Sequence, residues 1–121
     1  MLDYRIRVGL VTVRRDVTAR PGIFNWEKAE KRGAYLTDYV EKHFKDELIS
    51  FVDLKGINPK NIMYCMADAE KTVERFKNQK VDAIFFINCN FGNEEAIAYV
   101  AQNLRKPILL WAPLDDVFES D

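Results

Sequence analysis

Residues 81–93 read VDAIFFINCNFGN, and this stretch gives the clearest indication of the fold class. Val81 to Ile87 is a short, mostly apolar run, which is typical of a strand buried on both faces. A loop of polar residues with a glycine follows it. Asn93 then precedes a helical pattern, as an N-cap residue does. A buried strand that leads through a polar loop into a helix is the repeating unit of parallel α/β proteins.

The same alternation extends along the rest of the chain. Strands are expected at Arg5 to Val13, Leu48 to Leu54 and Ile108 to Trp111. Helices are expected from Asn25 to about Lys45, from Asp68 to about Asn78 and from Asn93 to Arg105, each capped by its first residue. The segment Asn61 to Met66 is apolar but too short to assign.

This order predicts a doubly wound α/β fold, flavodoxin-like or Rossmann-like, with a parallel sheet of about four strands in the order 2-1-3-4 and helices on both faces. A helix after the last strand is missing, so one apolar face of the third and fourth strands is expected to be bare. Further chain or a partner subunit would cover such a surface. We expect residues 1–121 to form one domain of a longer protein or of an assembly.

Composition excludes several classes of protein. Lys plus Arg number 18 and Asp plus Glu 19, a net charge of −1, so we expect no nucleic-acid partner. The apolar runs are too short to span a bilayer, and the N-terminus lacks the pattern of a secretory signal. Cys65 and Cys89 are too few for a disulfide framework or a zinc site. We expect a soluble cytoplasmic protein with no membrane partner.

Ligands of open parallel sheets bind at the carboxyl ends of the strands, near the switch point of the strand order. This rule selects residues 14–22, which contain Arg14, Arg15 and Arg20. Guanidinium groups suit substrates rich in oxygen, such as a polyol, a carboxylate or a phosphate. An arginine in a loop is as often paired with a neighbouring acid or with water as it is bound to a ligand.

The rule also selects residues 88–93. The amides of Asn88 and Asn90 donate and accept, as sugar hydroxyls require, and the Phe91 ring can lie against a sugar. We expect Asn93 to be chiefly a cap. Cys89 is not expected to be a catalytic thiol, because the chain's single histidine lies far away in the first helix.

Other features exclude familiar chemistry. The glycine fingerprint of dinucleotide sites, the P-loop and the acidic residues of a phosphoacceptor domain are missing. His43 stands alone on a helix, and Trp111 is expected to pack in the core or an interface. Asp115 and Asp116 can in principle hold a metal, but adjacent carboxylates in an acidic tail are more often solvated. No catalytic residues are predicted.

Three segments together resemble a known family. VGLVTVRRD at residues 8–16, INCNFGNEEAIAYV at 87–100 and KPILLWAPLDD at 106–116 are similar to the N-terminal domain of the L-fucose isomerase and L-arabinose isomerase superfamily. FGNEEA and the KPILLW strand are the most specific parts. Residues 48–80 match the family only in their alternation of strands and helices.

The resemblance implies a domain of an isomerase that interconverts aldoses and ketoses in carbohydrate metabolism. It implies a homo-oligomer in which this domain lends sugar-recognising side chains to the active site of a neighbouring subunit. Side chains of later domains would hold a divalent metal, typically Mn²⁺. This domain would then carry no metal ligand.

By position, the family's basic sugar contact falls at Arg14 or Arg15. Its aromatic contact falls near Cys89 or Asn90, where no aromatic occurs, so a preference for fucose is not implied. The predicted substrate-binding residues are Arg14, Arg15, Cys89, Asn90, Phe91 and Asn93. Two alternatives stay open, a stand-alone non-catalytic sugar-binding module and a nucleotide- or flavin-binding domain, the second disfavoured by the missing glycine fingerprint.

Overall fold

The structure is a computed structural model, and it describes residues 5–14, 26–90 and 93–112. Within these ranges the elements are β1 (Ile6–Arg14), α1 (Trp26–Phe44), β2 (Ile49–Val52), α2 (Met66–Asn78), β3 (Ala83–Asn90), α3 (Glu94–Leu104) and β4 (Ile108–Trp111). The strands form one parallel sheet in the order β2-β1-β3-β4. The predicted α/β fold and its strand order are confirmed.

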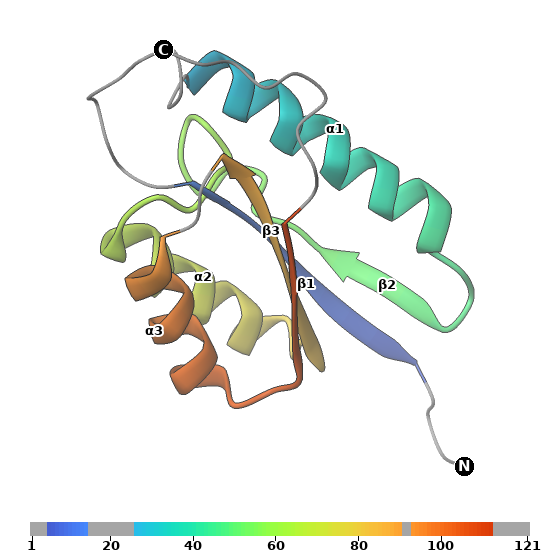
Figure 1. Cartoon of the computed structure of the whole chain (residues 1–121). Helices are drawn as coiled ribbons and strands as arrows, with labels where there is room; N and C mark the ends of the chain where they lie inside the picture. The colour runs from blue at the N-terminus through green and yellow to red at the C-terminus, as the bar shows by residue number, and fades with distance from the viewer. Residues whose placement is uncertain (1–4, 15–25, 91–92, 113–121) are drawn as a thin grey trace.

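Helices cover both faces of the sheet. Figure 1 shows α1 on one face and α2 beside α3 on the other. Each face has its own core, because side chains alternate along a strand: Leu10 of β1 packs under α1, and Val11 packs under α2 and α3. No helix among the described residues is long and apolar enough to cross a membrane.

Gly9 allows α2 to approach β1 closely. A β-carbon on Gly9 would lie 2.4 Å from Cε2 of Phe76, whose side chain is only 1% exposed. The ring has no room to retreat in a packed interior. A larger residue at position 9 would therefore force α2 away from the sheet.

Two boundaries differ from the expected ones. The N-cap of α2 is Cys65, and Asp68 lies in the first turn. There the Asp68 carboxylate accepts a hydrogen bond from the backbone of Tyr64 (3.2 Å), so it stabilises the start of α2 from inside the helix. β3 continues to Asn90, so the first part of the expected loop is strand. Asn25, the expected cap of α1, lies outside the described residues.

β4 is the strand at one side of the sheet, and its side chains are exposed. Its side chains Ile108, Leu109 and Leu110 are 50%, 58% and 54% exposed, whereas most of β3 is buried. On the α1 side, Trp111 meets Phe85 edge to face, with ring centroids 6.0 Å apart. The expected bare apolar surface is therefore present, but it is confined to β4 and lies on both faces of that strand.

α2 ends in a Schellman motif. The backbone N–H of Val81 donates to the carbonyl of Phe76 (3.1 Å), and that of Lys80 donates to the carbonyl of Lys77 (3.2 Å). The left-handed residue of this motif is usually glycine, but here it is Lys80, with φ 53°. A side chain in that conformation costs about 1 kcal/mol relative to glycine.

Candidate functional site

β1 and β3 end side by side at the carboxyl edge of the sheet. Val13 pairs with Asn88 and Arg14 with Asn90, so Cys89 is the extra residue of a bulge. Bulges redirect side chains and are common beside functional sites. The ends of β1 and β3 also mark the switch point of the strand order, where ligands bind in such folds. We use "carboxyl edge" for these strand ends, residues 58–64 and the start of α3.

Arg14 is the last residue of β1. Its side chain is 0% exposed, and its backbone N–H donates to the carbonyl of Met63 at 3.1 Å. A buried guanidinium is stable only when it is hydrogen-bonded, and its bonds are stronger in these surroundings than at the surface. The residue expected in a polar loop is thus held in place by the sheet.

Asn88 carries the clearest sign of a polar ligand. Its Oδ1 atom is buried and has no hydrogen-bond partner among the residues that the structure describes. An unpaired buried acceptor costs about 1–3 kcal/mol, so in a native fold it calls for an explanation such as a ligand or a bound water. The sequence indicates that the Asn88 amide suits sugar hydroxyls, but Asn88 is not among the predicted binding residues. The sequence feature that could have identified Asn88 as a binding residue is the position of its amide directly after the apolar run of β3.

Residues 58–64, the neighbourhood that the sequence left unassigned, form a third wall. Beyond the end of β2, these residues run alongside β1 in the position that β2 occupies earlier in the sheet. The backbone N–H of Met63 donates to the carbonyl of Thr12 (2.8 Å), and the Thr12 hydroxyl donates to the carbonyl of Asn61 (2.8 Å). The carboxyl edge is therefore bounded on both sides of β1.

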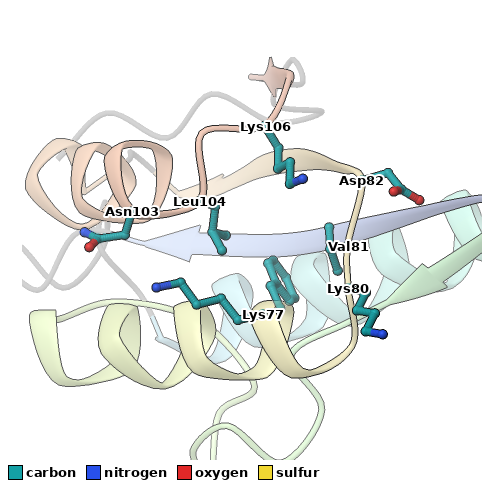
Figure 2. Close-up of a pocket in the computed structure, with 8 residues that line it drawn as sticks. Lys77, Lys80, Val81, Asp82, Asn103, Leu104 and Lys106 are labelled. Atoms are coloured by element: carbon teal, nitrogen blue, oxygen red, sulfur yellow. The ribbon is translucent and has the colours of Figure 1, made fainter.

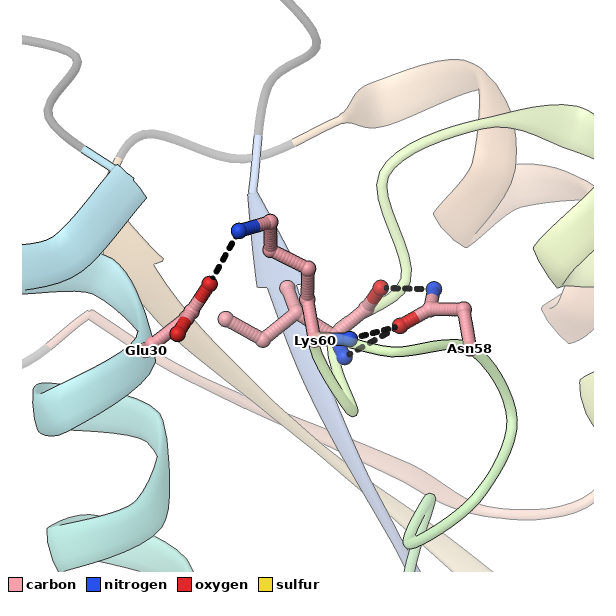
Figure 3. Close-up of polar contacts among 4 residues, drawn as sticks. Glu30, Asn58 and Lys60 are labelled. Atoms are coloured by element: carbon pink, nitrogen blue, oxygen red, sulfur yellow. Dashed lines mark hydrogen bonds and ion pairs between the residues drawn. The ribbon is translucent and has the colours of Figure 1, made fainter.

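Asn58 and Lys60 stabilise this wall (Figure 3). The Asn58 amide donates to the carbonyl of Ile62 at 2.7 Å, and its oxygen accepts from the backbone of Lys60 at 2.9 Å. The Lys60 ammonium forms an ion pair with Glu30 of α1. The wall is thus fastened both to itself and to the helix that covers the sheet.

Asn93 joins α3 to the same wall. Its Oδ1 accepts from the backbone N–H of Ala96 at 3.1 Å, which confirms the predicted cap. Its Nδ2 donates to the carbonyl of Tyr64 at 2.9 Å. Both ends of this amide already have partners inside the protein, so Asn93 holds the carboxyl edge together.

Neither thiol is activated. Burial raises the pKa of Cys89 to about 12, and the side chain lies under Gly33 of α1 with 3% exposure. Burial also raises the pKa of Cys65, whose thiol donates to Asp68 at 3.3 Å. Both residues are protonated at neutral pH and are poor nucleophiles.

Several predicted residues lie outside the described ranges, namely Arg15, Arg20, Phe91, Asp115 and Asp116. The side chain of Asn90 is likewise not described. The binding roles of the six predicted residues stay predictions: Arg14, Arg15, Cys89, Asn90, Phe91 and Asn93. His43 is exposed in the last turn of α1, where its ring stacks on Tyr39 with centroids 4.1 Å apart.

Within residues 5–14, 26–90 and 93–112, no group of three or more His, Cys, Asp or Glu side chains is arranged to hold a metal ion. The described part of the chain therefore does not fit the Mn²⁺ that the family resemblance implies for the whole enzyme.

These features define a parallel α/β domain with a polar edge at its switch point. The sequence matches the family described as fucose/sulfoquinovose isomerase, N-terminal domain, over residues 9–121. The chain belongs to this family of sugar isomerase domains.

A second similarity is more local. The chain is 32% identical over 87 residues to a polyribonucleotide nucleotidyltransferase of Wigglesworthia glossinidia brevipalpis, which covers 60% of this chain and 12% of that protein. The chain thus matches only a small part of that relative's length. No solved structure matches the chain.

Proposed function

We propose that this chain is the sugar-recognition domain of a metal-dependent aldose–ketose isomerase of the cytoplasm. Its carboxyl edge supplies side chains to an active site shared with a neighbouring subunit of a homo-oligomer. The observation that carries the proposal is the placement of Arg14 and Asn88 on adjacent strand ends, both within the residues that match the family.

The two side chains are chemically complementary to a sugar. A guanidinium only donates hydrogen bonds, and the Oδ1 of Asn88, which has no partner among the described residues, only accepts them. Hydroxyl groups of a sugar can accept from a guanidinium and donate to an amide oxygen. Neither side chain exchanges a proton at neutral pH, so their role is to bind and orient the sugar. Proton transfer then belongs to another part of the enzyme.

The exposed side chains of β4 support a place in a larger assembly. Three consecutive apolar residues that are each at least 50% exposed form a surface that proteins normally cover. The metal ligands are proposed to lie outside the described residues. Activity of the full-length protein should disappear on chelation and return with Mn²⁺, and activity that survives chelation would refute metal dependence.

Arg14→Lys in the full-length protein tests sugar recognition. Lysine keeps the charge but loses the planar fork of donors. We expect kcat/KM to fall at least about tenfold for the sugar that is turned over among L-fucose, L-arabinose and sulfoquinovose. Arg5→Lys, at an exposed residue just before β1, is the matched control and should leave kcat/KM unchanged. Unchanged kinetics in Arg14→Lys would contradict the proposed role.

Mixed oligomers test the shared site. Subunits with Arg14→Ala are combined with subunits that lack a metal ligand in the catalytic domain. If sites lie between subunits, some interfaces of the mixture hold both intact halves and activity returns. No recovery would contradict sharing. A full-length protein that binds sugars without isomerising any would favour the stand-alone binding module.

A further inference from the structure

The outer side of β4 presents backbone hydrogen-bonding groups. Within the described part of the chain β4 is the last strand of the sheet, so only its inner side pairs with β3. On that side the backbone N–H of Ile84 donates to the carbonyl of Pro107 at 2.9 Å. Successive residues of a strand point their backbone groups to alternate sides, so those of Leu109 also face β3, and those of Ile108 and Leu110 face outward. The outward groups need a partner strand or water.

β4 lacks the charges and bulges that commonly keep an outermost strand from pairing. Residues 108–111 carry no charge, and their register with β3 is regular. Pro107 directly precedes β4, but the N–H that a proline lacks would point toward β3 at this position, so no outward donor is lost. The outer side of β4 is therefore able to accept another strand.

The side chains of β4 are exposed on both faces of the sheet. Ile108 and Leu110 lie on the face of α2 and α3, because they pair with β3 residues of that core. Leu109 lies on the face of α1, because it pairs with Phe85. A helix docked on one face would leave the other face bare. A strand added beside β4 brings side chains to both faces at once.

The charges that flank β4 are complementary to those of a second copy of the same segment. Arg105 and Lys106 precede β4, and Figure 2 shows Lys106 on the segment that joins α3 to β4. Asp115 and Asp116 follow β4 in the sequence. Two copies of β4 related by a twofold axis run antiparallel, so the basic end of each copy meets the acidic end of the other. Opposite charges stabilise paired strands, whereas a parallel arrangement would bring like charges together.

We propose that two copies of this chain associate by antiparallel pairing of β4, centred on Leu110, so that their sheets join into one. The outward backbone groups of Leu110 then bond to those of Leu110 in the second copy, and those of Ile108 bond to those of Ala112. On the α1 face, Leu109 lies opposite Trp111 of the second copy. A register shifted by one residue would set outward groups against inward ones. This interface is one contact of the proposed homo-oligomer and rests on that proposal.

Sedimentation equilibrium of the 121-residue chain, together with amide hydrogen exchange followed by NMR, tests this interface. We expect a monomer–dimer equilibrium with a Kd below about 100 μM. The outward amides of Ile108 and Leu110 should exchange more slowly in the dimer, whereas the amide of Leu109, which already faces β3, should change little. A chain that stays monomeric up to about 300 μM, or a dimer with unchanged exchange at Leu110, would overturn the proposal.

Leu110→Lys sets two like charges beside each other on the twofold axis. Because Leu110 is 54% exposed, the variant should fold as the unaltered chain does, which thermal unfolding checks. Its Kd for association should rise at least about tenfold. Tyr35→Lys, on α1 with its side chain 65% exposed, is the matched control and should dimerise normally. Undiminished association of Leu110→Lys would show that β4 is not the interface.

Charge reversal tests the direction of pairing and the identity of the partner. One variant carries Arg105→Glu with Lys106→Glu, and another carries Asp115→Lys with Asp116→Lys. Each alone should associate at least about tenfold more weakly, because like charges then meet at both ends of β4. An equimolar mixture should recover dimers that contain one copy of each variant. A mixture without such dimers would refute antiparallel pairing.

The full-length protein separates this interface from the proposed function. A monomeric 121-residue chain beside an active, oligomeric full-length enzyme would refute pairing through β4 and leave the proposed function intact. A dimer through β4 in a full-length protein that isomerises no sugar would refute the proposed function and support the interface.

Discussion

The two edges of the sheet carry polar residues in opposite settings. At the carboxyl edge, Arg14 is fully buried and the Oδ1 of Asn88 lacks a partner within the described ranges. At the other edge, Lys77, Lys80 and Lys106 are exposed around a pocket. A buried polar group is satisfied only by partners with matching hydrogen bonds, whereas an exposed charge attracts many ligands weakly. The first setting favours specificity and the second favours charge selection.

Arg14→Ala should have the largest effect. It removes a large, fully buried side chain, so we expect the free energy of unfolding to fall by about 3 kcal/mol. Lys106→Ala, at the other edge, should stay within about 0.5 kcal/mol. Chemical denaturation measures both, and equal losses would erase the contrast between the edges.

Asn93→Ala should have the next largest effect. It removes the cap of α3 and leaves the Tyr64 carbonyl without its donor, which together should cost about 2 kcal/mol. Asn93→Asp keeps the cap but cannot donate to Tyr64, so it should lose only about half as much. If the two variants unfold at the same denaturant concentration, the tether between α3 and residues 58–64 contributes nothing.

Asn88→Leu should separate stability from binding at the carboxyl edge. Leucine has a similar volume and removes the side-chain carbonyl that lacks a partner among the described residues. The free energy of unfolding should therefore rise by about 1 kcal/mol while sugar turnover falls. Denaturation of the chain and kinetics of the full-length protein test the two halves. A less stable variant with normal turnover would show that Asn88 serves the fold and not the ligand.

Glu41 provides a reference for a polar group away from both edges. Burial, followed by a hydrogen bond and charge repulsion from Asp53, raises the pKa of Glu41 from 4.5 to about 7. Between these values the folded state holds a proton that the unfolded state releases, so stability falls as pH rises from 4.5 to 7. Because the pair is partly open to solvent, screening should limit the loss to less than about 1 kcal/mol. Denaturation curves at about pH 5 and about pH 7 measure this pH dependence of stability, and Glu41→Gln should reduce it. An unchanged difference in stability between the two pH values would rule out Glu41 as its source.

The order of helices and strands could be predicted because the buried face of each element sets the spacing of apolar residues in the sequence. The apolar runs of β1, β3 and β4 and the capping residue Asn93 indicate strands and a helix without tertiary information. The boundaries at Asp68 and Asn88 could not be read in this way. Asp68 caps from inside the first turn, and Asn88 and Cys89 look like a loop although strand pairing continues through the bulge.

The position of the candidate site followed from topology, but its composition did not. Parallel pairing brings the ends of β1 and β3 together, so Arg14 could be named from the sequence. Its burial depends on contacts with distant parts of the chain. The same holds for the wall at residues 58–64, which pairs with β1 only because β2 ends at Val52.

Amide shifts on titration with sugars test the central claim most directly. The 121-residue chain is titrated with L-fucose, L-arabinose and sulfoquinovose in turn. The carboxyl edge predicts that at least one sugar shifts the amides of Val13, Asn88 and Met63 and leaves Lys80 and Val81 unchanged. Shifts at Lys80 and Val81 alone, or no shifts with any of the sugars, would contradict recognition of sugars at the carboxyl edge.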